Sequence, residues 1–183
     1  IVVIFSAGNG HYGFPGQHPD LISAGGAFMA QDESLRASDY SSGFMSNIYT
    51  GRRVPDVCGV VGMSPGAKYI MLPLEPGDQI DKSGEGGVHP AGDETKGNDG
   101  WAAISGTSAA APQLTGLSAL ILEARSGLKP AKVREIMHKS ARDIVTGNCS
   151  PMTGGAPATT GPDIATGFGL ADAHQAVLLA KER

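Results

Sequence analysis

The chain has 183 residues, of which 40% are hydrophobic and 5% aromatic, with 27 glycines and a formal net charge of −4. A chain of this length ordinarily folds as one domain with a sizeable core. No basic block suggests nucleic-acid binding, and no apolar run approaches the roughly 20 residues that a membrane span needs. The composition predicts an α/β domain with many tight turns that binds neither nucleic acid nor membrane.

Apolar segments predict strands at residues 1–7, 21–27 and 55–61. The first is wholly apolar, as strands of a buried parallel sheet are, and it runs directly into Asn9, which glycines flank. Ligands of open α/β sheets bind beyond the carboxyl ends of strands, where an amide side chain can donate to a developing negative charge. A simple turn role for Asn9 stays open, because Asn-Gly is a strong turn signal.

Residues 75–100 are rich in Gly, Asp, Glu and Lys and predict an exposed loop insertion. The flanking segments 69–74 and 101–105 are predicted strands that can pair as a ribbon. Structural calcium is possible here, although the irregular spacing of the acidic residues favours a solvated loop. The acidic residues concerned are Asp78, Asp81, Glu85, Asp93 and Glu94.

The second half of the chain predicts helices at 107–125, 130–141 and 170–181 from the spacing of apolar residues. Residues 146–166 form a connector rich in Gly, Pro and Thr. Asp163 within it is interpreted as a turn residue, with a calcium ligand as the less favoured reading.

A run of small residues, Gly106–Pro112, opens the first of these helices. The first N–H groups of a helix have no helical partner and lie at the positive end of its dipole, which suits an oxyanion. Thr107 is a predicted N-cap, and Ser108 is the candidate nucleophile. A helix start that only packs closely is the alternative.

Together these segments resemble the subtilisin-like serine proteases, the subtilases. Gly106–Pro112 resembles the active-serine motif of that family, and Ser6–Asn9 resembles its oxyanion-asparagine segment. The segment Arg52–Val57 also resembles the related sedolisins, but those carry an aspartate at the oxyanion position, so Asn9 argues against them. Further matches in the family's order extend the resemblance from residue 1 to about residue 178. They are Phe14–Gly16, Leu21–Ala27, Arg36–Ser38, Tyr40–Gly43, Val54–Val57, Thr166–Leu170 and Asp172–Ala173.

The resemblance implies a three-layer α/β/α sandwich with a mostly parallel sheet, and the activity of a serine endopeptidase. Ser108 would attack the scissile carbonyl, while the side chain of Asn9 and the Ser108 N–H hold the oxyanion. The chemistry requires no cofactor. The resemblance also implies a secreted or extracytoplasmic protein, and structural calcium is frequent in the family.

The same resemblance assigns a pocket for the polypeptide substrate. Ser6, Ala7 and Gly8 would form one wall of it. Gly10 and Gly13 suggest an uncrowded floor, which favours large apolar or aromatic substrate side chains.

The catalytic aspartate and histidine of the family precede its asparagine, and neither has a matching position here. We therefore expect residues 1–183 to be the C-terminal part of a catalytic domain with the N-terminal half absent. Such a chain would be nearly silent as a protease, and its open strand edge would be held by the missing half or prone to associate. None of the histidines follows the family's pattern for the base: His11, His18, His89, His138 and His174.

Two other functions remain alternatives. A non-catalytic, subtilase-like module that binds peptides or partners would need no base. An α/β-hydrolase esterase would need a Gly-x-Ser-x-Gly elbow, and the segment Gly106–Ala110 lacks the second glycine.

Cys58 and Cys149 are the only cysteines. Cys58 falls in an apolar strand and is predicted to be buried, whereas Cys149 falls in a polar loop and is predicted to be exposed. A disulfide between them remains open, and their separation does not suit a metal site.

Overall fold

A four-stranded sheet forms the centre of the molecule, with β2 (Ile22–Met29) as its middle strand. β1 (Ile4–Ser6) and β6 (Val57–Val60) pair with it in parallel, and β3 (Leu35–Ala37) pairs with it antiparallel. The predicted α/β class and mostly parallel sheet are therefore confirmed. The computed structural model describes residues 1–63, 70–83, 86 and 95–182.

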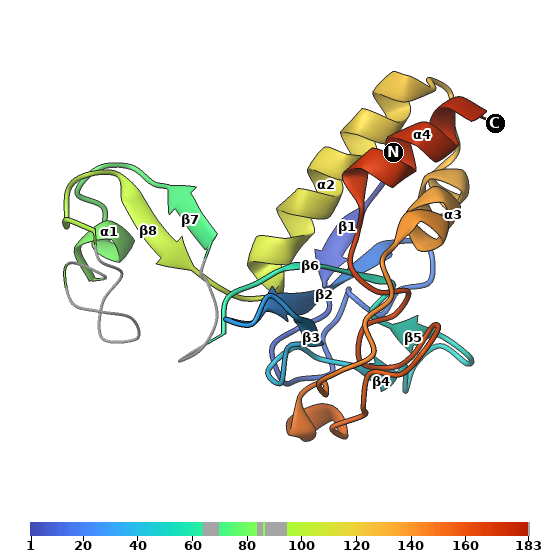
Figure 1. The fold of residues 1–183 in the computed structure, drawn as a ribbon, viewed down its shortest axis with the longest axis horizontal. Helices are drawn as coiled ribbons and strands as arrows, with labels where there is room; N and C mark the ends of the chain where they lie inside the picture. The colour runs from blue at the N-terminus through green and yellow to red at the C-terminus, as the bar shows by residue number, and fades with distance from the viewer. Residues whose placement is uncertain (64–69, 84–85, 87–94, 183) are drawn as a thin grey trace.

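Three helices pack together along one side of this sheet (Figure 1). They are α2 (Thr107–Ala124), α3 (Pro130–Ser140) and α4 (Ala173–Glu182), and each confirms a predicted helix. α4 begins three residues later than predicted, because Leu170 is still held in a β-bridge with Cys58. No helix in the described part of the chain is long and apolar enough to cross a membrane.

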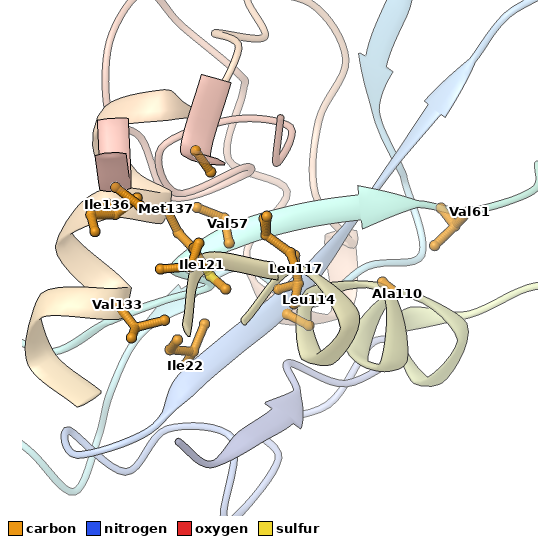
Figure 2. Packing of buried hydrophobic residues seen from close by; sticks show 13 residues of the cluster. Ile22, Val57, Val61, Ala110, Leu114, Leu117, Ile121, Val133, Ile136 and Met137 are labelled. Carbon is orange, nitrogen blue, oxygen red and sulfur yellow. The ribbon is translucent and has the colours of Figure 1, made fainter. Parts of the chain in front are cut away.

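The main core lies between the sheet and these helices (Figure 2). α2 packs very closely on β6, because a Cβ atom on Gly59 would lie only 2.9 Å from the Cα of Ala110. Any larger residue at position 59 would push the beginning of α2 away from the sheet. The labelled core residues are Ile22, Val57, Val61, Ala110, Leu114, Leu117, Ile121, Val133, Ile136 and Met137.

A second, smaller core lies against Ala27 of β2 and Cys58 of β6. The connector that follows α3 supplies most of its other members, among them Ile144 and Cys149. Next to it lie the two-stranded ribbon of β4 (Phe44–Met45) and β5 (Arg53–Val54) and the short 3₁₀ helix η1 (Pro151–Thr153). None of these three short elements was predicted.

The prediction for Cys149 was wrong, because its side chain is fully buried in the second core. Polar neighbours in the sequence suggested a surface loop, but the loop folds inward and the Cys149 N–H donates to the carbonyl of Ala156. Cys58 is buried as predicted. Both residues are free cysteines, so the disulfide left open by the sequence is not formed, and burial raises the pKa of each thiol.

Asp163 forms the turn that the sequence favoured. Its carboxylate accepts hydrogen bonds from the N–H groups of Thr159 and Thr166, at 2.6 and 2.8 Å. Both carboxylate oxygens are therefore engaged in organising the connector before α4.

The predicted ribbon before Ser108 is present. β7 (Ile70–Pro73) and β8 (Trp101–Ile104) pair antiparallel and project from the body of the molecule (Figure 1). Between them lies α1 (Gln79–Ser83), a helix that was not predicted in the loop 75–100. Tyr69, which the prediction gave to the first strand, lies outside the described residues.

The calcium prediction for this loop stays a prediction. Glu85, Asp93 and Glu94 lie outside the described residues. Asp81 is buried, and its Oδ2 accepts hydrogen bonds from the N–H groups of Gly77 and Gly100. Across the described ranges, no group of three acidic, histidine or cysteine side chains is placed to hold a metal ion.

A buried ion pair joins Arg52, the residue before β5, to Asp56, the residue before β6. Both oxygens of Asp56 accept hydrogen bonds of 2.7 Å from the guanidinium of Arg52, and Oδ2 also accepts the Ser23 N–H. Nε2 of His138, whose ring stacks on Phe168, lies 3.4 Å from Oδ1 of Asp56. Burial by itself raises the pKa of Asp56, but these partners outweigh it and lower the pKa to about 2.

Candidate active site

The loop that carries Asn9 follows directly from the end of β1. The Ala7 N–H continues the pairing with β2 by donating to the carbonyl of Ala24. Ser42 then clamps the loop, because its Oγ accepts from the N–H groups of Gly10 and His11, both at 3.0 Å. The Ser42 N–H donates to the carbonyl of Gly8. Asn9 itself is exposed, at the carboxyl edge of the sheet.

Ser108 lies in the first turn of α2 and its side chain is exposed. Gly106 precedes the helix with a φ of 127°, a backbone conformation that a non-glycine residue rarely adopts. The carbonyl of Gly106 accepts the N–H groups of Ala109 and Ala110. The Ser108 N–H has no acceptor among the described residues, as expected for the second position of a helix.

Thr107 joins the two segments. Oδ1 of Asn9 accepts hydrogen bonds from the Thr107 N–H at 3.0 Å and from the Thr107 Oγ1 at 2.9 Å. The same hydroxyl accepts the Gly8 N–H at 3.3 Å. Because the oxygen of the Asn9 amide is held twice, its Nδ2 is turned away from Thr107 and toward the start of the helix.

The side-chain nitrogen of Asn9 and the backbone nitrogen of Ser108 both lie beside Gly106. A Cβ atom built on Gly106 would lie 3.2 Å from Nδ2 of Asn9 and 3.8 Å from the nitrogen of Ser108. The structure thus brings together two residues that are 99 positions apart in the sequence. Two N–H donors that lie close together can hold a developing negative charge.

Thr107 was predicted as an N-cap, and this was wrong. The N-cap position is Gly106, and no side chain caps the helix at that position. Instead the Asn9 side chain, from a distant loop, accepts the Thr107 N–H. A short stretch of sequence shows a threonine at the start of a helix. It does not contain the distant Asn9 side chain that accepts the Thr107 N–H.

The three residues predicted as a pocket wall follow the strand in order. Ala7 and Gly8 are buried and Ser6 is half-buried. The ring of His11 lies against Gly8, since Nε2 would be 3.0 Å from a Cβ atom at that position. The role of Ser6, Ala7 and Gly8 in binding substrate stays a prediction.

The uncrowded floor that Gly10 and Gly13 suggested is not present. A Cβ atom on Gly10 would lie 3.2 Å from Sδ of Met152, and one on Gly13 would lie 3.2 Å from the carbonyl oxygen of Ala7. The space beside both glycines is therefore already filled by protein. These glycines permit close packing and do not open a pocket.

None of the described histidines forms a hydrogen bond with Ser108. His18 lies against Tyr49 and His138 against Phe168, while His174 is exposed in α4. His11 is exposed beside Gly8. His89 lies outside the described residues.

Comparison with known families decides the class of the chain. A profile described as the Subtilase family matches residues 1–169. The chain belongs to the subtilase family. The resemblance on which the sequence prediction depended is therefore confirmed, over a slightly shorter range than the predicted 1–178.

Solved structures show the same fold for this subtilase chain. Fervidolysin from Fervidobacterium pennivorans, a keratinolytic enzyme related to subtilisin, superposes with a TM-score of 0.67 at 23% identity over 97% of the chain. A protease of Pseudoalteromonas arctica gives 0.61 at 22% identity over 98%, and a lanthipeptide protease gives 0.63 at 19% over 98%. The subtilase chain covers 22%, 42% and 50% of these three structures, respectively. No curated protein matches its sequence.

Sequence reasoning missed two residues that shape this part of the subtilase chain. Ser42 belongs to the segment Tyr40–Gly43, whose match to the family was seen, but nothing in that segment indicated that one hydroxyl would clamp the Asn9 loop. Thr107 was noticed for another role. Both act through contacts with residues more than 30 positions away.

Proposed function

We propose that this chain carries the serine and the oxyanion-binding groups of a subtilisin-type endopeptidase. Ser108 is the nucleophile, and Nδ2 of Asn9 with the Ser108 N–H binds the oxyanion. The convergence of these two donors beside Gly106 is the observation that supports the proposal most strongly. The double anchoring of Oδ1 by Thr107 adds to it, since it fixes which end of the amide faces the substrate.

The reaction follows from these roles. Oγ of Ser108 attacks the carbonyl carbon of the scissile peptide, its proton passes to a base, and the carbonyl oxygen becomes the oxyanion between the two N–H donors. Collapse releases the amine, which takes up that proton, and leaves an acyl group on Ser108 that water then hydrolyses. Donors fixed before the reaction stabilise the charge without reorganising.

The base and its orienting carboxylate belong, in this proposal, to polypeptide outside the described residues. A serine hydroxyl is a weak nucleophile until a base accepts its proton, and no described histidine forms a hydrogen bond with Ser108. The isolated chain would therefore be nearly inactive. We use "assembled enzyme" for this chain together with the segment that supplies the base.

The substrate is a polypeptide that lies along Ser6–Gly8, at the end of β1. Its specificity depends on side chains on the opposite side of the cleft as well. We also propose an extracytoplasmic location, because members of the subtilase family are typically secreted.

Labelling with a fluorophosphonate tests this function. We expect the isolated chain to react slowly, and the assembled enzyme to react rapidly and only at Ser108, as mapped by mass spectrometry. The Ser108→Ala variant of the assembled enzyme should not react. Rapid, stoichiometric labelling of the isolated chain would contradict an external base. An unreactive assembled enzyme would leave a non-catalytic binding module as the better interpretation.

Substitution of Gly106 by alanine should disable the site from within. The added methyl group would stand 3.2 Å from Nδ2 of Asn9, one of the two donors assigned to the oxyanion, and the φ of 127° would be strained. Loss of one oxyanion donor costs about 10²–10³ in rate, so we expect at least this loss in the labelling rate of the assembled enzyme. Gly116→Ala is the control, because a Cβ atom there meets nothing within 4 Å. Equal rates for the two variants would place the oxyanion elsewhere.

A further inference from the structure

The ribbon of β7 and β8 projects from the body of the molecule (Figure 1), and one of its faces carries exposed apolar side chains. Met71 is paired with Ala103 and Pro73 with Trp101, so these four side chains share a face, which we call the arm face. Met71 is 45% exposed and Trp101 47% exposed. On the opposite face Ala102 is only 3% exposed, so Met71 and Trp101 lie on the more exposed face of the ribbon.

The base of the ribbon is fixed to the body of the molecule. Oγ of Ser105 and the hydroxyl of Tyr40 both donate to the carbonyl of Gly62, at 2.8 and 3.0 Å. Ser105 directly follows β8 and precedes Gly106. The strand β8, which carries Trp101, is therefore followed by the anchored Ser105 and then by the start of α2, which carries Ser108.

The distance from the arm face to the serine suits a bound polypeptide. Trp101 and Ser108 are seven positions apart in the sequence, and an extended chain spans at most about 3.6 Å per residue. The two positions are therefore no more than about 25 Å apart. A substrate held at Ser108 reaches the arm face with roughly seven or more residues of its own extended chain.

The arm face can contact a partner through its side chains, but not through pairing with a further strand. The Trp101 N–H donates to Oδ1 of Asp99, the Trp101 carbonyl accepts from Oγ1 of Thr95, and Pro73 has no N–H to offer. Addition of a further strand is blocked at this point of the ribbon. Recognition would depend on contact with the indole, the thioether and the proline ring.

Two exposed acidic residues lie at one end of the arm face and favour a partner with basic residues. Glu75 follows Pro73 by two residues and Asp99 precedes Trp101 by two, so the register places both acids at the same end of the ribbon. Both are exposed. An apolar segment with a basic residue beside it matches this surface better than one with an acidic residue.

We propose that the arm face binds an extended apolar segment of the polypeptide substrate, flanked by basic residues and distant from the bond cleaved at Ser108. The inference rests on the proposed function, because the occupant is the substrate of that site. Trp101 and Met71 supply the contact area, and the anchored strand keeps that contact in line with Ser108.

Trp101 is the only tryptophan of the chain, so its own fluorescence reports on the arm face. The experiment uses the full chain with Ser108→Ala and a synthetic peptide of four Leu-Ser repeats flanked by two lysines at each end. We expect saturable binding with a blue shift of the tryptophan emission and reduced quenching by acrylamide. The same peptide flanked by glutamates should bind at least fivefold more weakly.

A matched pair of variants identifies the surface. Met71→Ser should weaken peptide binding about fivefold or more, whereas Met45→Ser, which changes a methionine of similar exposure in the other two-stranded ribbon, should leave it unchanged. Peptide binding without any change in tryptophan emission, or equal weakening by both variants, would overturn the proposal. A blue shift that depends on protein concentration alone would assign the arm face to a second copy of the chain.

The labelling test of Ser108 uses a small reagent that does not reach the arm face. Failure of that test with intact peptide binding would remove the protease and leave a peptide-binding ribbon. Rapid labelling without peptide binding would keep the protease and remove the arm face from its substrate recognition.

Discussion

Replacement of Asn9 by alanine is expected to slow the labelling of Ser108 by fluorophosphonate about 10²–10³-fold in the assembled enzyme. Nδ2 of Asn9 is the side-chain donor that lies beside Gly106, 3.2 Å from the position of a Cβ atom there, and the Ser108 nitrogen lies 3.8 Å from the same position. Loss of one such donor raises the barrier by about 3–4 kcal/mol, a magnitude established on a member of the subtilase family. The quantity measured is the second-order rate constant of labelling, obtained from the disappearance of unlabelled protein in mass spectra.

The structural cost of this variant has to be separated from its chemical effect. Alanine at position 9 also removes the acceptor of Thr107, whose buried N–H and hydroxyl would lose a partner, at about 1–3 kcal/mol of folding stability. Asn9→Asp keeps an oxygen for Thr107 and still removes the donor, so it should lose the rate with less loss of stability. Asn148→Ala removes an exposed amide whose Nδ2 donates to the carbonyl of Gly155, and it serves as the control. If Asn9→Asp labels as fast as the parent, then Asn9 is only a turn residue.

The positions of Asn9 and Ser108 were predictable because each depends on a local signal. An apolar strand that ends in Gly-Asn-Gly and a run of small residues before a helix are visible in short windows. The end of β1 then places Asn9 at the carboxyl edge of the sheet, where ligands of open α/β sheets bind. The sequence could predict that these groups meet, but it could not predict how the amide is turned.

What the sequence could not predict depends on contacts between distant segments. Thr107 orients Asn9 across 98 positions, and Ser42 clamps the same loop across more than 30. The predictions for Cys149 and for the pocket floor at Gly10 and Gly13 were wrong for the same reason. The burial of these residues depends on segments that fold over them. Residue type indicates what a side chain can do, and long-range packing decides which of those roles it takes.

Replacement of Asp56 by alanine is expected to lower the free energy of unfolding by about 3–5 kcal/mol, because it leaves the guanidinium of Arg52 buried without its partner. Arg52 is 11% exposed, and both of its hydrogen bonds to Asp56 measure 2.7 Å. The chain provides a matched control in Asp32, which pairs with Arg36 at the same i,i+4 spacing but at 60% exposure. Asp32→Ala should leave the urea midpoint unchanged, since exposed pairs contribute little.

The dependence on pH distinguishes a lost ion pair from a simple packing defect. Folding lowers the pKa of Asp56 from 3.8 to about 2, so its charged form stabilises the folded state above pH 4. That stabilisation, about 2 kcal/mol from the shift, disappears as the pH falls from about 4 to about 2. The difference in unfolding free energy between the parent and Asp56→Ala should therefore shrink by this amount over that interval. A difference that stays constant with pH would mean that Asp56 acts through packing alone.

The same variant also separates stability from chemistry in the proposed site. Asp56 begins the turn into β6, on which α2 packs, but it touches neither Asn9 nor Ser108. Asp56→Ala should thus reduce the folded fraction and leave the labelling rate per folded molecule unchanged, whereas Asn9→Asp should do the reverse. If Asp56→Ala changes denaturation but not labelling, and Asn9→Asp changes labelling more than denaturation, the oxyanion site and the buried ion pair are independent features of one fold.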